Sequence, residues 1–241
     1  MAMDPETTRT IVGVIGNVIS FFLFLSPVPT FLKIWQDKSV QHFKPHTYLV
    51  TALNCAMWCL YGMPSVHPDS LLVITINGVG LVIESIYVGI FFIYSNTWPK
   101  RKTIIMCIIG EAVFFFAVVF ITFFFLQGTT NRSMLVGLIC IVMNIGMYTA
   151  PLTVMSRVIK TKSVKYLPFY LSLANLANGT VWSIYALIKF DSYVLIPNAL
   201  GTISGLVQLA LFGIYYKTTN WDEDDSSQQP EMELHNPHNK A

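Results

Sequence analysis

The stretch FLFLSPVPTFLKIWQDKSV at residues 22–40 recurs in altered form as GMYTAPLTVMSRVIKTKSV at residues 146–164. With an offset of 124 residues, Pro27 aligns with Pro151, and both stretches end in the tripeptide Lys-Ser-Val. Each proline lies in a long apolar run, where it would interrupt a helix by removing a backbone hydrogen bond. An internal repeat of this kind predicts two similar structural units in one chain.

The repeat extends beyond these two stretches. Two further pairs of segments align: NCAMWCLYG (54–62) with NGTVWSIYA (178–186), and, after a small difference in loop length, DSLLVITINGVG (69–80) with DSYVLIPNALG (191–201). The coinciding polar and aromatic residues are Asn54 and Asn178, Trp58 and Trp182, Tyr61 and Tyr185, and Asn77 and Asn198. The repeat therefore predicts equivalent places for these pairs in the two halves.

The composition indicates an integral membrane protein embedded in a lipid bilayer. Of the 241 residues, 54% are hydrophobic and 12% are charged, whereas soluble domains carry about 25% charged residues. The net charge of +2 gives no sign of a nucleic-acid partner. Neither a glycine-rich phosphate loop nor a metal-ligating or nucleophile–base pattern is found. We therefore expect no enzyme, no cofactor and no metal.

Seven apolar stretches are long enough to cross a bilayer as helices, which takes about 20 residues. They lie at residues 10–33, 46–64, 71–94, 103–126, 133–157, 168–189 and 193–216. Because three crossings are an odd number, a fourth is needed to start both repeats from the same side. The predicted fold is thus all-α, with seven transmembrane helices as two parallel three-helix repeats and a linker helix (3+1+3). Its parts are an extracellular N-terminus (1–9), a first repeat (10–94), a linker helix (103–126), a second repeat (133–216) and a disordered cytosolic tail (217–241).

The distribution of basic residues predicts the orientation. Twelve of the fifteen Lys and Arg residues follow the first, third, fifth or seventh span. Since cytosolic loops carry the excess of positive charge, the N-terminus is expected outside and the tail in the cytosol. The histidines of the connecting loops, His42, His46 and His67, are expected to face solvent.

Over residues 11–217 the sequence resembles the SWEET family of sugar transporters. The resemblance rests on GNVISFFLFLSPVPTF, KSV, APLTVMSRVIKTKSVKYLPF, Trp182, and the asparagines of ITINGVG and LIPNALG. The sequence is similar to those of plant members of the family, especially the members associated with hexoses. The resemblance implies a bidirectional facilitative uniporter for hexoses such as glucose, located in the plasma membrane. It also implies homo-oligomers, trimers among them.

The resemblance further implies roles for individual residues. The expected sugar contacts are Asn77, Asn198, Trp58 and Trp182. Positions that set pocket width match Leu23, Asn54, Met147 and Asn178. The outer gate matches Tyr61, Tyr185 and Asp191. Hinge prolines on the cytosolic side match Pro27, Pro151 and Pro168. The fourth hinge proline is expected at Thr47, but this chain has Pro45 two residues earlier, so either Pro45 serves the hinge or this helix bends differently.

The chemistry of these residues agrees with a sugar site. Amides such as those of Asn77 and Asn198 can donate to and accept from neighbouring hydroxyls, and tryptophan offers a flat apolar face with a polar edge. The alternative is that the asparagines bond between helices, as they do in other membrane proteins. Bulky Leu23 and Met147 favour a monosaccharide over sucrose.

Three other functions stay open as alternatives. A sucrose-preferring SWEET transporter would need a wider pocket. Proline-glutamine-loop amino-acid transporters share the repeat plan, but their marker dipeptide is absent, because Val28 follows Pro27 and Leu152 follows Pro151. A seven-helix receptor also has an outside N-terminus, although a 3+1+3 repeat is not expected of one.

Overall fold

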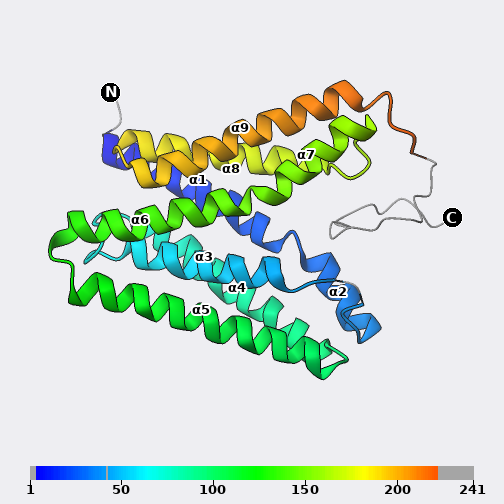
Figure 1. Cartoon of the computed structure of the whole chain (residues 1–241). Coiled ribbons are helices and arrows are strands. Elements are labelled where there is room, and N and C mark those ends of the chain that lie inside the picture. The colour runs from blue at the N-terminus through cyan, green and yellow to red at the C-terminus, as the bar shows by residue number, and fades with distance from the viewer. Residues whose placement is uncertain (1–3, 42, 222–241) are drawn as a thin grey trace.

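The computed structural model describes residues 4–41 and 43–221, which form nine helices and no strand (Figure 1). The helices are α1 (Pro5–Leu25), α2 (Val28–Asp37), α3 (His46–Gly62), α4 (Leu71–Tyr94), α5 (Trp98–Phe124), α6 (Gly128–Met147), α7 (Thr149–Thr161), α8 (Phe169–Ile188) and α9 (Ser192–Tyr215). We call α1–α4 the first half and α6–α9 the second half, with α5 as the linker helix.

Two of the predicted spans are each divided into two helices. The span expected at 10–33 consists of α1 and α2, and the span expected at 133–157 consists of α6 and α7. Because Pro27 has no N–H, the Leu23 carbonyl lacks its usual donor and accepts from the Ser26 N–H at 3.1 Å instead. Pro27 thus lies between two helices as the N-cap of α2, whereas Pro151 lies in the first turn of α7, after the break at Tyr148.

The number of crossings agrees with the prediction. Six helical stretches in the described residues are long and apolar enough to span a membrane, with α1–α2 and α6–α7 each taken as one stretch. The seventh crossing is α3, whose 17 residues lie at the lower limit for a spanning helix. The chain is therefore an integral membrane protein with the predicted all-α architecture.

The two halves are alike in the ends of their helices. The C-cap residues that follow α2 and α7 are Lys38, with φ 51°, and Lys162, with φ 52°, so both helices stop at a residue in the left-handed conformation that terminates many helices. These lysines are the first residues of the repeated Lys-Ser-Val tripeptide. The sequence repeat is thus also a repeat of backbone conformation.

Packing between the helices follows the same pseudo-symmetry (Figure 1). The helix of the third crossing in each half packs on the helices of the first and second crossings. In the first half α4 packs on α1 and α3, and in the second half α9 packs on α6 and α8. Between the halves, α1 packs on α8 and α6 packs on α3. The linker α5 packs on α3, α4 and α6. This is the expected 3+1+3 arrangement.

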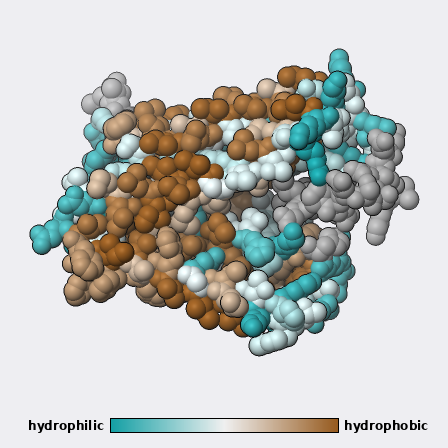
Figure 2. Space-filling model, viewed as in Figure 1, coloured by the Kyte–Doolittle hydropathy of each residue, from teal (hydrophilic) through white to brown (hydrophobic). Residues whose placement is uncertain are grey.

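Apolar side chains cover the middle of the molecule, and hydrophilic ones gather at its two ends (Figure 2). On α5, exposed aromatic residues include Phe114, Phe116, Phe120 and Phe124. An exposed apolar surface of this extent suits contact with lipid.

The segments at the chain ends differ in part from the predicted boundaries. α1 begins at Pro5, so helix includes most of the predicted N-terminal segment 1–9. After α9, the Thr218 hydroxyl donates to the Lys162 carbonyl at 2.7 Å, which holds this stretch against the end of α7. Residues 222–241 of the predicted tail lie outside the described residues.

Candidate functional site

The aligned asparagines of the third helices have the same hydrogen bond. Asn77 Nδ2 donates to the Val73 carbonyl at 2.8 Å, and Asn198 Nδ2 donates to the Val194 carbonyl at 2.8 Å. Both side chains are half-buried. One N–H of each amide is used in this way, which fixes the side chain and presents equivalent amide groups from the two halves.

The aligned tryptophans also have matching surroundings. Trp58 lies edge-to-face with Tyr61, with ring centroids 5.3 Å apart, and Trp182 lies edge-to-face with Tyr185 at 5.2 Å. Both tryptophans are buried. Each half therefore supports its tryptophan with a tyrosine one helical turn further along the same helix.

Two polar bridges join the halves next to these residues. Asn178 Oδ1 accepts from the Ser20 hydroxyl at 2.5 Å, and the same hydroxyl oxygen accepts from Trp182 Nε1 at 3.0 Å. In the opposite interface, Asn144 Nδ2 donates to Asn54 Oδ1 at 3.3 Å. The two asparagines predicted to set pocket width are thus each bonded to the first helix of the other half.

Ser20 and Asn144 were missed by the sequence reasoning, although the repeat contained a signal for them. With the offset of 124 they align with each other, as two polar residues inside apolar runs. Leu23 and Met147 follow three residues later, close to the helix breaks, and both are half-buried. Their effect on pocket width stays a prediction.

At one end of the molecule, a buried carboxylate joins the halves. Tyr61 Oη donates to the two carboxylate oxygens of Asp191 at 2.9 and 3.0 Å. Asp191 is only 4% exposed and also caps α9, accepting from the backbone N–H groups of Tyr193 and Val194. This bond holds the end of α3 against the start of α9, so this end is closed.

Tyr185, the repeat partner of Tyr61, has different neighbours. The Arg9 guanidinium lies 4.2 Å from the centre of its ring and donates to the Asp69 carbonyl at 2.7 Å. The Asp69 carboxylate pairs with Lys189, which lowers the pKa of that carboxyl. The structure therefore brings Tyr61 and Asp191 together and leaves Tyr185 in a neighbouring cation-containing cluster.

The prediction for His67 holds only in part, because its ring is packed into the closed end and 25% of the side chain is exposed. The ring stacks on Tyr61 with centroids 4.6 Å apart, and Nε2 lies 3.3 Å from Asp191 Oδ2. Nδ1 lies 3.0 Å from the Ser133 hydroxyl. Burial lowers the pKa of His67; the Asp191 carboxylate opposes this shift, and the cations Arg9 and Lys189 reinforce it. Of the other two histidines, His46 is exposed as predicted, and His42 lies outside the described residues.

The predicted hinge prolines all lie at helix starts. Pro27 is the N-cap of α2, and Pro151 is the third residue of α7. Pro45 and Pro168 are the N-caps of α3 and α8, the second crossing helices of the two halves. Thr47 lies in the first turn of α3, where its carbonyl accepts from the Thr51 hydroxyl at 2.8 Å.

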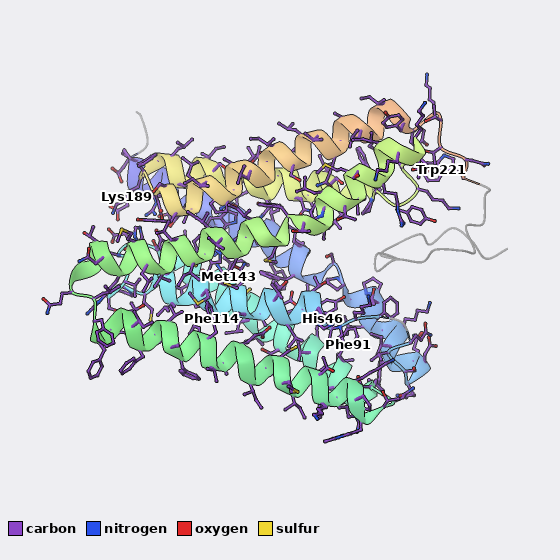
Figure 3. The ribbon with its side chains drawn as sticks, viewed as in Figure 1. His46, Phe91, Phe114, Met143, Lys189 and Trp221 are labelled. Carbon is purple, nitrogen blue, oxygen red and sulfur yellow. The ribbon has the colours of Figure 1, made fainter. Side chains whose placement is uncertain are left out.

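Lys189 lies at the end of the molecule that holds the Tyr61–Asp191 bond, and Trp221 lies at the other end, where the α2 and α7 ribbons diverge (Figure 3). A groove of about 530 Å³ runs along α7 and is lined by residues between Thr149 and Thr161. In the described part of the chain, no group of three or more His, Cys, Asp or Glu residues could hold a metal ion.

Amides and buried indoles at equivalent places in the two halves, both of them uncharged, suit reversible binding of a polar, uncharged ligand. Comparisons with known proteins show the family. The model of the family described as "Sugar efflux transporter for intercellular exchange" matches residues 10–98 and 134–220, one match in each half. The chain belongs to the SWEET family.

Relatives and a solved structure cover nearly the whole chain. The bidirectional sugar transporter SWEET5 of Arabidopsis thaliana is 59% identical over 226 residues, covering 94% of each chain. SWEET4 of the same plant is 55% identical, covering 92% of this chain and 88% of its own. The structure of a eukaryotic SWEET transporter matches with a TM-score of 0.85 and 35% identity, covering 88% of this chain and 99% of that one. These SWEET proteins are transporters, and the chain is not an enzyme.

Proposed function

We propose that this protein is a bidirectional, facilitative sugar uniporter that carries hexoses such as glucose. The observation that supports it best is the pair of matched asparagine–tryptophan sets, one in each half, with Asn77 and Asn198 in equal hydrogen bonds. The printed names of SWEET5 and SWEET4, both bidirectional sugar transporters, support the same substrate class.

The sugar would bind where the two halves meet. The amides of Asn77 and Asn198 donate to and accept from ring hydroxyls, and Trp58 and Trp182 cover the C–H faces of the ring. Asn54 and Asn178, held by the bridges to Asn144 and Ser20, shape the sides of the pocket. Transporters built from two repeats commonly bind substrate at such an interface.

Transport would proceed by alternating access around this site. The Tyr61–Asp191 bond closes the outer end, while the helix breaks at Pro27 and ahead of Pro151 let α2 and α7 move as separate segments. Pro45 and Pro168 begin equivalent helices and form the other pair of hinges, with Pro45 acting in place of a proline at Thr47. Tyr185 belongs to the same outer gate through its neighbour Arg9.

The preference for hexoses follows from Leu23 and Met147. Both side chains are larger than the small residues that a wider pocket would need, and they lie at aligned positions near the breaks. A disaccharide would then be excluded by size.

Transport would be uncoupled from ions, because the proposed site is neutral. Two carboxylates lie in the spans: Glu84, which is buried on α4, and Glu111, which is half-buried on α5. Neither belongs to the site residues. The orientation would be N-terminus outside and C-terminus in the cytosol of the plasma membrane, with the chain acting as a homo-oligomer.

Glucose counterflow into liposomes containing the purified protein tests this proposal. Liposomes preloaded with unlabelled glucose should accumulate labelled glucose transiently, and an imposed pH gradient should leave no sustained accumulation. Concentration of glucose above equilibrium that persists with the gradient would contradict uniport. Absence of counterflow would contradict sugar exchange itself.

A further inference from the structure

Both helix breaks are packed against the third helix of their own half in the same way. Phe24, just before the α1–α2 break, aligns with Tyr148, which forms the α6–α7 break. A Cβ at Gly80 would lie 2.4 Å from the Phe24 ring, and a Cβ at Gly201 would lie 2.7 Å from Tyr148 Oη. Such distances do not occur between real side chains, so Gly80 provides the space for the Phe24 ring and Gly201 provides the space for the Tyr148 hydroxyl.

These glycines lie close to the proposed sugar contacts. Gly80 follows Asn77 by three residues on α4, and Gly201 follows Asn198 by three residues on α9. Residues three apart on a helix lie on the same face. Each break is therefore connected to its half of the site by one turn of helix.

A tyrosine hydroxyl adds a directed bond at each of these contacts. In the first half, Tyr87 Oη on α4 donates to the Phe24 carbonyl at 2.9 Å. In the second half, Tyr148 Oη donates to the Pro197 carbonyl on α9 at 2.6 Å. The donor lies on α4 in the first half and at the α6–α7 break in the second half. Each of the two bonds nevertheless connects a helix break to the helix, α4 or α9, that carries the asparagine of that half.

The bond to Phe24 also stabilises the break. In a continuous helix the Phe24 carbonyl would accept from the Val28 N–H. A hydroxyl from α4 provides a donor that does not require helical register across Ser26 and Pro27. The tyrosine thus favours the divided conformation over a continuous helix.

We infer that Tyr87 and Tyr148 are positioning residues of the transport cycle. Their hydroxyls fasten each break to the helix that carries Asn77 or Asn198, so that movement of α2 or α7 follows the state of the sugar site. This inference rests on the proposed alternating-access function. In the proposed cycle the two helix breaks stay fixed, and α2 and α7, the cytosolic segments beyond them, move.

Tyr87→Phe and Tyr148→Phe remove the hydroxyls while keeping the rings. Phenylalanine is compatible with the second position, since Phe24 fills the equivalent place in the first half. Tyr48→Phe is the matched control, because the Tyr48 ring contacts Tyr87 at 5.6 Å while its hydroxyl makes no hydrogen bond among the described residues. Reporter cysteines are placed at the exposed residues Leu32 on α2 and Thr153 on α7.

The readouts are glucose exchange, equilibrium glucose affinity and the alkylation rate of each reporter, with and without glucose. We expect each variant to slow exchange about five-fold, the effect of losing one ordinary hydrogen bond, and to change affinity less than two-fold. Tyr87→Phe should alter alkylation of Leu32→Cys at least two-fold even without sugar, and Tyr148→Phe that of Thr153→Cys. Glucose should then no longer change alkylation of that reporter.

Three results would overturn the inference. One is exchange and alkylation equal to those of Tyr48→Phe. Another is a loss of glucose affinity as large as the loss of exchange, since the hydroxyl would then act on the sugar site itself. The third is an equal effect of each variant on both reporters. Because the alkylation rates without sugar test the two bonds directly, the inference can fail or hold even if the wild-type protein exchanges no glucose.

Discussion

Ser20 and Asn144 lie 124 residues apart in the sequence, and each bonds to an asparagine of the opposite half. The Ser20–Asn178 bond is 2.5 Å long and is extended by Trp182, whereas the Asn144–Asn54 bond is 3.3 Å long. The two halves are thus joined beside the candidate site by two equivalent bridges, of which the Ser20 bridge is the tighter.

Ser20→Ala should therefore lower both stability and transport. It leaves the Trp182 N–H and the Asn178 oxygen without their partner, at a cost of about 1–3 kcal/mol for a buried group. We expect a lower thermal unfolding temperature in detergent and slower glucose exchange. Ser85→Ala is the control, since the exposed Ser85 hydroxyl donates to the Leu81 carbonyl of its own helix and to no other described residue. Equal behaviour of the two variants would show that the bridge contributes nothing.

Pro27→Ala should fold but transport more slowly. Alanine supplies the N–H that Pro27 lacks, so the Leu23 carbonyl can regain its helical bond and α1 can run into α2. We expect glucose exchange to fall several-fold with little change in unfolding temperature. In Pro5→Ala, at the first position of α1, no helical bond is gained and exchange should stay at the wild-type rate. Wild-type exchange by Pro27→Ala would refute the hinge.

The Leu23→Ala, Met147→Ala double variant should admit sucrose. Removing both side chains widens the pocket near the breaks, and the rate of sucrose uptake relative to glucose should rise several-fold. Leu206→Ala, which shortens an exposed leucine on α9, should leave the ratio unchanged. The size argument fails if the double variant reaches the membrane, exchanges glucose and takes up no more sucrose than the wild type.

External acid should favour opening of the outer gate through His67. The pKa of His67 in the closed gate is below that of an exposed histidine, about 6.5. The closed gate therefore binds this proton less tightly than an open one. The contribution of neutral His67 to closure is complete above pH 6.5 and is lost as the pH falls below it.

The measurement is labelling of an Ala186→Cys variant by an impermeant thiol reagent, since Ala186 is fully buried and its carbonyl accepts from the backbone N–H of the gate residue Asp191. The ratio of the labelling rate at pH 5.5 to the rate at pH 7.5 should be greater for this variant than for the same variant that also carries His67→Gln. Comparing the two ratios removes the effect of pH on the reagent. His46→Gln, at the opposite end, should leave the response intact. A greater response in the absence of His67 would reverse the sign and contradict this account of the gate.

The sequence was sufficient for the fold because the repeat and the apolar runs are long-range patterns. The pairing of Asn77 with Asn198 and of Trp58 with Trp182 followed from the same alignment, and their bonds in the structure match. Where single residues decide, the sequence was less informative. Ser20 is a small residue in an apolar run, and its alignment with Asn144 was the one sequence signal for it; its bond to Asn178 is seen only in the structure.

The structures of loops and helix ends were also difficult to predict from the sequence. His67 lies in a polar connection, which favours solvent exposure, yet its ring contacts three separate segments, at Tyr61, Ser133 and Asp191, and is half-buried. Pro27 indicated a bend, whereas the bonds of Ser26 and Phe24 produce two helices. The sequence also contained no sign of where α3 begins, so only the structure shows that Pro45 and Pro168 both lie at N-caps, of α3 and α8.

Uptake of labelled glucose and sucrose, side by side, into liposomes holding the purified protein is the most direct test of the central claim. The wild-type protein should admit glucose and little sucrose, and Asn198→Ala should lose glucose entry while remaining folded. Glucose entry unchanged by Asn198→Ala would contradict the site. Sucrose entry at a comparable rate would overturn the hexose preference, and no entry of either sugar would contradict sugar transport.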